Sequence, residues 1–95
     1  MAYVYILKSE KNGMLYISST VNIYRRLHQH QLGYVQATKA FLPVKLVFHH
    51  ICPNLNVARK LAKKLKSFKR KDFIEKIIRD GRIRLLENAP VAQFG

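Results

Sequence analysis

The chain has 95 residues, which is enough for one domain with one hydrophobic core and too few for two. Hydrophobic residues make up 48% of the sequence, and this excludes a chain that is disordered from end to end. Lys and Arg number 18 against five acids, and the resulting formal charge of +13 indicates a polyanionic partner. The alternative is an unrelated protein whose basic surface is merely solvated.

Nucleic acid fits this charge better than an anionic membrane surface, because no apolar run approaches the roughly 20 residues that span a bilayer. The N-terminal segment is typical of a strand and lacks the basic region and cleavage site of a secretory leader. The lone Cys52 can form neither an intrachain disulfide nor a metal knuckle, and its apolar surroundings predict a small core residue. These features favour a cytoplasmic protein without membrane contact.

The chain begins with a predicted hairpin. Residues 3–8 and 14–19 are rich in β-branched and aromatic residues and predict two strands. The Asn12-Gly13 pair between them is a strong signal for a hairpin turn.

A helix is expected to follow the hairpin and to run to about residue 31. Thr20 or Asn22 can cap its start, and Gly33 is suited to end it. Residues 34–43 show no clear periodicity and predict a loop.

A third strand is predicted over residues 44–52, and two helices follow over about residues 55–66 and 69–80. Asn54 or Asn56 can cap the first of these helices.

The predicted element order is β-β-α-β-α-α. A hairpin first and helices later predict an α+β fold of mixed layers, built on a small, mainly antiparallel three-stranded sheet. We expect one domain over residues 1–80 and a tail over residues 81–95 that is partly disordered.

Four side chains along this order suit phosphodiester chemistry. Tyr5 and Tyr16 lie on the two hairpin strands, while Arg26 and His30 are one turn apart and share a helix face. A guanidinium can pair with phosphate oxygens, and a phenol or an imidazole can relay a proton. The alternative is ordinary strand tyrosines beside solvated helix residues.

Residues 59–71 carry a dense block of positive charge without any acid. Its members are Arg59, Lys60, Lys63, Lys64, Lys66, Lys69, Arg70 and Lys71. Like charges one turn apart repel, and a bound polyanion would relieve that repulsion. We predict nucleic-acid contact here, with Arg25 and Lys39 adding to the same surface. The alternative is a solvated pair of Lys-rich helices.

As an ordered set these features resemble the GIY-YIG nuclease superfamily, and most closely its small stand-alone members. The matching residues are YVYIL at 3–7, LYISST at 15–20, Arg25-Arg26, His30, Thr38-Lys39, Pro43, KLV at 45–47 and LKS at 65–67. The resemblance covers about residues 2–79 and implies the fold of that superfamily.

The resemblance also implies residue roles. Tyr5 would help to activate the attacking water, and Tyr16 would line the site and form hydrogen bonds there. Arg26 would steady the scissile phosphate, with His30 as a helper on the same helix. The family uses a single divalent ion, usually Mg²⁺, which one glutamate on a later helix holds and which stabilises the leaving oxyanion.

Two residues depart from the family pattern. Ser18 replaces the glycine of the second motif, where a glycine permits close backbone approach. Ala62 falls where the family has its metal-binding glutamate, and a hard cation needs oxygen ligands. Asp72 or Glu75 can take over that role only through a rearrangement. We therefore expect no metal site and no cofactor, with Mg²⁺ required only if the chain is active.

The sequence thus predicts a degenerate endonuclease domain that binds nucleic acid, DNA in preference to RNA, with weak or no metal-dependent cleavage. No small-molecule ligand is expected. One alternative is an active Mg²⁺-dependent endonuclease that uses a displaced acid or one supplied by a partner. The other is a basic protein-interaction module, so whether the chain is an enzyme stays open at this point.

Overall fold

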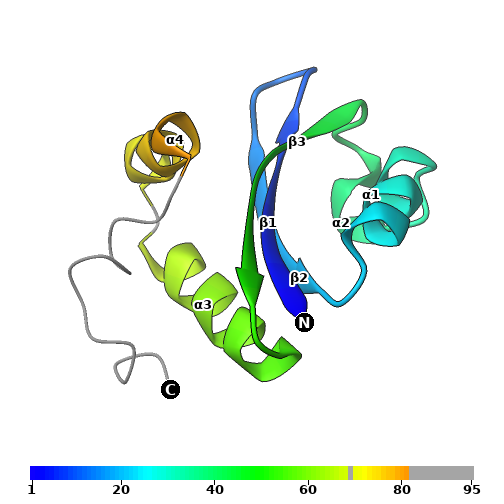
Figure 1. Cartoon of the computed structure of the whole chain (residues 1–95). Coiled ribbons are helices and arrows are strands. Elements are labelled where there is room, and N and C mark those ends of the chain that lie inside the picture. Colours follow the sequence, from blue (N-terminus) through cyan, green and yellow to red (C-terminus); the bar gives the residue numbers. More distant parts are fainter. Residues whose placement is uncertain (69, 82–95) are drawn as a thin grey trace.

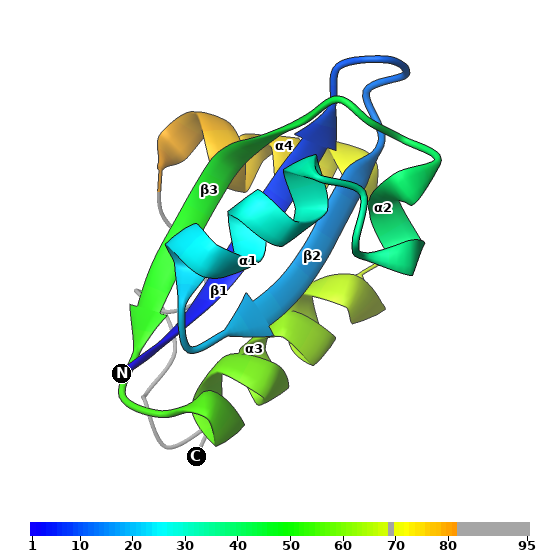
Figure 2. The same cartoon turned by 90° about the vertical axis from the view of Figure 1, so that its right-hand side faces the viewer.

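The computed structural model describes residues 1–68 and 70–81, so Lys69 and nearly all of the predicted tail lie outside the described residues. A sheet forms the middle layer, with α1 and α2 on one face and α3 and α4 on the other (Figure 1; Figure 2 shows the α1 face). In chain order the elements are β1 (Ala2–Ser9), β2 (Leu15–Thr20), α1 (Ile23–Gln31), α2 (Gln36–Lys39), β3 (Val44–Cys52), α3 (Leu55–Ser67) and α4 (Lys71–Asp80).

The sheet has the order β2-β1-β3, and both strand pairs are antiparallel, as predicted. Tyr5 in the central strand lies opposite Ser18 on β2 and His49 on β3. Successive residues of a strand point to opposite faces. Val4 and Ile6 therefore face α3 and α4, whereas Tyr5 faces α1.

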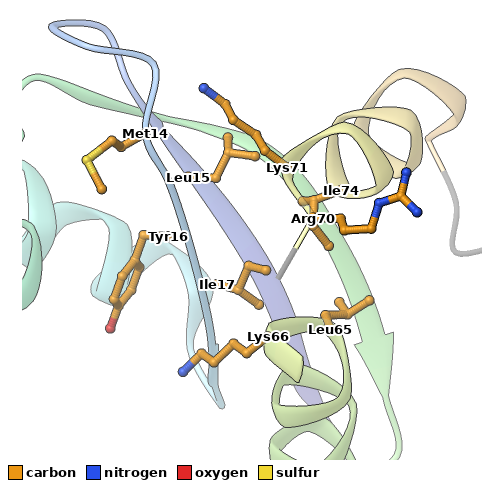
Figure 3. Close-up of a pocket in the computed structure, with 9 residues that line it drawn as sticks. All are labelled: Met14, Leu15, Tyr16, Ile17, Leu65, Lys66, Arg70, Lys71 and Ile74. Carbon is orange, nitrogen blue, oxygen red and sulfur yellow. The ribbon is translucent and has the colours of Figure 1, made fainter. Parts of the chain in front are cut away.

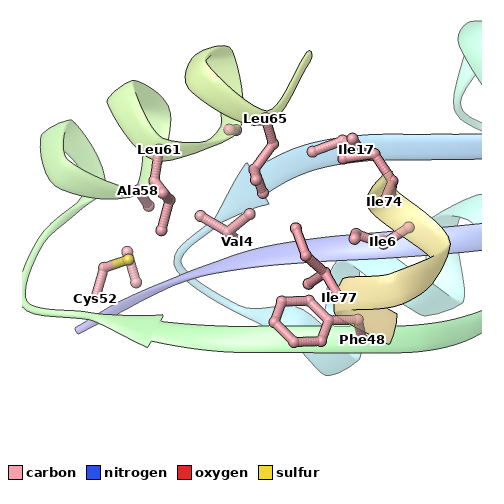
Figure 4. Packing of buried hydrophobic residues seen from close by; sticks show 12 residues of the cluster. Val4, Ile6, Ile17, Phe48, Cys52, Ala58, Leu61, Leu65, Ile74 and Ile77 are labelled. Carbon is pink, nitrogen blue, oxygen red and sulfur yellow. The ribbon is translucent and has the colours of Figure 1, made fainter. Parts of the chain in front are cut away.

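The larger hydrophobic cluster lies between the sheet and the pair α3 and α4 (Figure 4). Its side chains include Val4, Ile6, Ile17, Phe48, Leu61, Leu65, Ile74 and Ile77. Burial of such apolar side chains stabilises the fold by about 1.5–3 kcal/mol each relative to exposure. The α1 face holds a smaller buried cluster, whose members are Tyr5, Leu7, Ile23 and Val44.

The structure selects one residue from each pair of predicted helix caps. The Asn22 side chain accepts a hydrogen bond from the Arg25 backbone N–H at 3.0 Å and begins α1. The Asn54 side chain accepts one from the Val57 backbone N–H at 2.9 Å and begins α3. Gly33 follows the end of α1 with a φ of 79°, a backbone conformation that favours glycine.

The predicted order of elements is confirmed, with two local differences. Helix α2 is a single turn inside the segment that was predicted as a loop, and four residues are too few to show an apolar period. Helix α4 begins at Lys71 rather than at residue 69. Arg70 has an extended backbone (φ −122°, ψ 110°), so the helix can begin only after it.

The main cluster gives a direct test of the packing. Leu65 is 0% exposed, and Leu65→Ala is expected to lower the free energy of unfolding by about 2–5 kcal/mol because it leaves a cavity. Urea denaturation measures the loss. The exposed neighbour provides the control, since Lys64→Ala should change stability by less than about 0.5 kcal/mol. Equal effects of the two substitutions would contradict the packing described here.

Candidate functional site

The candidate site is built around a buried chain of three hydrogen-bonded side chains. The hydroxyl oxygen of Tyr5, on β1, lies 2.9 Å from Nε2 of His30, on α1. Nδ1 of His30 lies 2.7 Å from Oγ1 of Thr38, on α2. Tyr5 is 1%, His30 0% and Thr38 1% exposed. The chain of contacts therefore ties three elements together in the interior of the α1 face.

Tyr16 completes an aromatic cluster at this point. Its ring centroid lies 5.3 Å from that of His30 and 6.4 Å from that of Tyr5. Figure 3 shows why Tyr16 belongs to this face: its neighbours Leu15 and Ile17 point toward α3 and α4, and Tyr16 points the other way. Tyr16 is half-buried, so it lies at the border between the interior chain and solvent.

Burial sets the protonation state of His30. Burial and, to a smaller extent, the positive charge of Arg26 together lower the pKa of the imidazole from 6.5 to about 4. His30 is therefore neutral at pH 7, with one ring nitrogen that donates and one that accepts. Either Tyr5 O–H donates to Nε2 while Nδ1–H donates to Thr38, or both donations run in the opposite direction. The arrangement can relay a proton along its length.

Burial raises the pKa of Tyr5, although the Arg26 and Ser18 side chains beside the phenol act against this shift. The phenol is therefore protonated at neutral pH and forms hydrogen bonds as a neutral group. Arg26 is half-buried, and its Nη1 donates to Oε1 of Gln29 at 3.1 Å. Gln29 thus orients the guanidinium beside the aromatic cluster.

Two pockets with cationic side chains in their lining lie along β2, one at each end of the strand. The N-terminal parts of α1 and α3 form the first pocket, of about 310 Å³, and bring Arg25, Arg26 and Arg59 together at the end of β2. The second pocket, of about 440 Å³, lies between β2 and the pair α3 and α4 (Figure 3). Its cationic residues are Lys66, Arg70 and Lys71.

The remaining residues of the predicted nucleic-acid surface lie elsewhere. Lys60, Lys63 and Lys64 line a separate shallow pocket on the outer side of α3. Lys39 is exposed at the end of α2. The predicted contact by Lys69 lies outside the described residues. The cations of residues 59–71 form one block in the sequence. The structure divides them between separate pockets.

At none of the three positions considered for the metal ligand does a carboxylate lie on the α1 side of the sheet. Ala62 is 4% exposed and belongs to the main hydrophobic cluster. Asp72 pairs with Arg70 at 2.9 Å, and Glu75 pairs with Lys71 at 3.8 Å, both on the α4 side of the sheet. Within residues 1–68 and 70–81, no group of three His, Cys, Asp or Glu side chains is arranged to hold a metal ion.

Thr38 matched the family pattern as part of Thr38-Lys39, but the sequence predicted no role for it in the site. Thr38 is eight residues from His30 and lies in a segment without periodicity, so its contact with the imidazole follows only from the position of α2.

In the part of the chain that the structure describes, no helix is both long and apolar enough to cross a bilayer.

A family model, that of the GIY-YIG catalytic domain, matches residues 1–79. Because the match covers most of the chain, this protein belongs to the GIY-YIG family. No curated protein and no solved structure gives a significant match to it. Membership indicates a nuclease-type function related to nucleic acid, and GIY-YIG nucleases typically use divalent metal ions.

The low pKa of His30 predicts how stability depends on pH. The unfolded chain protonates His30 near pH 6.5 and the folded chain only near pH 4, so the unfolded state binds more protons between these values. Stability is therefore full above about pH 6.5 and falls by the order of a few kcal/mol as the pH drops to about 4. His50, whose pKa burial also lowers, contributes in the same direction.

Urea denaturation at a series of pH values checks this dependence. His30→Gln should flatten the fall in stability below pH 6.5, whatever its effect on stability at neutral pH. His28 is exposed on the same helix, so His28→Gln is the matched control and should keep the wild-type profile. A His30→Gln profile parallel to that of the wild type would show that His30 is not the titrating group.

Proposed function

We propose that this protein is a nucleic-acid-binding GIY-YIG domain with weak or no metal-dependent cleavage. The observation that carries the proposal is the position of Ala62. A buried methyl group stands where the family resemblance expects the metal-binding carboxylate, and the cations of α3 flank it. Alanine supplies no oxygen ligand for a hard cation.

The proposed ligand is the phosphate backbone, with DNA favoured over RNA. Arg25, Arg26 and Arg59 share one pocket, and guanidinium groups pair with phosphate oxygens in a bidentate manner. Backbone contacts of this kind fix position and carry no direct sequence information. Binding is therefore expected to be strong at low salt and largely independent of sequence.

A second candidate function is an active endonuclease that uses an acid from a partner or from a displaced segment. The intact cluster of Tyr5, Tyr16, Arg26 and His30 favours it, because its rings and hydrogen bonds are all in place. Under this alternative a carboxylate from elsewhere replaces the missing ligand for the divalent ion.

A combined binding and cleavage assay separates the two candidates. Purified protein is mixed with plasmid, branched DNA or RNA in the presence of Mg²⁺ or Mn²⁺, and bound and cut fractions are measured in the same sample. We expect binding without cleavage, since losing the stabilisation that a metal supplies costs roughly three orders of magnitude in rate or more.

Robust nicking that disappears in Tyr5→Phe and in Arg26→Ala would overturn the proposal and establish the active endonuclease. Loss of nicking in both variants is needed because it excludes a contaminating nuclease. Failure to bind either DNA or RNA at low salt would also overturn it and would support a basic protein-interaction module.

A further inference from the structure

The outer edge of β2 connects the two cationic pockets. In the described part of the chain β2 pairs only with β1, so its other edge carries no strand. Ser19 and Thr20 line the first pocket, whereas Leu15, Tyr16 and Ile17 line the second. The six residues of β2 span roughly 20 Å at about 3.4 Å per residue. The two pockets therefore lie at opposite ends of β2.

Helix α3 runs along this edge and contributes a cation at each end. Arg59 lines the first pocket and Lys66 lines the second. They are seven residues apart, about two helical turns, and therefore lie on the same flank of α3. Ala62 lies between them in sequence, and its methyl group is buried in the main hydrophobic cluster.

The same helix carries a second set of cations on its outer side. Lys60 and Lys64, four residues apart, line the shallow pocket with Ser67 and do not line either pocket of the β2 edge. All four side chains of interest, Arg59, Lys60, Lys64 and Lys66, are exposed. Net charge alone therefore cannot distinguish the two sides of α3, but the positions of their cations relative to β2 can.

We propose that one phosphate backbone follows the outer edge of β2, held by Arg25, Arg26 and Arg59 at one end and by Lys66 at the other, and that Lys60 and Lys64 take no part. This inference rests on the proposed function and names its contact surface.

Arg70 and Lys71 line the second pocket too, but they are secondary contributors. Arg70 already pairs with Asp72, and Lys71 with Glu75. A cation that has an acidic neighbour attracts a phosphate less strongly. Within the described residues no acid lines either of the two pockets. The positive potential there is therefore attributed mainly to Lys66 and to Arg25, Arg26 and Arg59.

The test compares two double variants of the full chain that remove the same charge from the same helix. Arg59→Gln/Lys66→Gln changes the β2 edge, and Lys60→Gln/Lys64→Gln changes the outer side. The affinity for a short mixed-sequence DNA duplex is measured by fluorescence anisotropy over a range of salt concentrations. Circular dichroism and urea denaturation confirm that both variants are folded.

The edge variant is expected to reduce the slope of log affinity against log salt by about 1.8, which is two contacts at about 0.9 each. The outer variant should keep the wild-type slope. Equal reductions in both variants, or a reduction in the outer variant alone, would overturn the inference while leaving nucleic-acid binding intact. A wild-type chain that does not bind overturns both the inference and the proposed function.

Lysine protection provides a second measurement on the unchanged protein. Acetylation with and without the duplex, read by mass spectrometry, should show protection of Lys66 and continued labelling of Lys60 and Lys64. Protection of all three to the same extent would contradict a path confined to the β2 edge.

Discussion

Strand β1 pairs with β2 on one side and with β3 on the other, and helices cover both of its faces. Its residues are therefore fixed in two directions at once. Val4 and Ile6 lie in the cluster beneath α3 and α4, and this places Tyr5 on the opposite face beneath α1. A slip of one residue would exchange the two sets, so the hydrophobic core itself holds the candidate site in position.

The buried chain of Tyr5, His30 and Thr38 has a structural role as well as a chemical one. The apolar cluster on the α1 face is small, and burying an imidazole costs free energy unless its nitrogens have partners. Here both ring nitrogens have one, and among the described residues no buried side-chain N or O atom lacks a partner. These contacts fix α1 and α2 to the sheet. The cluster therefore contributes to the stability of the α1 face in addition to any chemistry that it performs.

Local features of the fold were readable from the sequence because short-range physics determines them. Three such features depend only on neighbours within a few residues. They are the hairpin, the helix caps at Asn22 and Asn54, and the placement of Arg26 and His30 on one side of α1. The contact between His30 and Thr38 depends on how α2 folds back, which no periodic pattern records.

The division of the cations on α3 has a different cause. Helical spacing alone puts Arg59 and Lys66 on one flank and Lys60 and Lys64 on another. Which flank meets the edge of β2 depends on how Leu61 and Leu65 pack against the sheet, and that packing is long-range. The burial of Ala62 in the same cluster follows from this orientation and not from its residue type.

The proposed function follows from the difference between holding a phosphate and cutting it. Arginine and lysine side chains along β2 interact with charge that the phosphodiester already carries, so they contribute to binding before any bond breaks. Rate acceleration requires a group that acts on charge that develops only as the bond breaks. Ala62 is buried in the main cluster and supplies no such group, so we propose that the edge of β2 performs the first task and not the second.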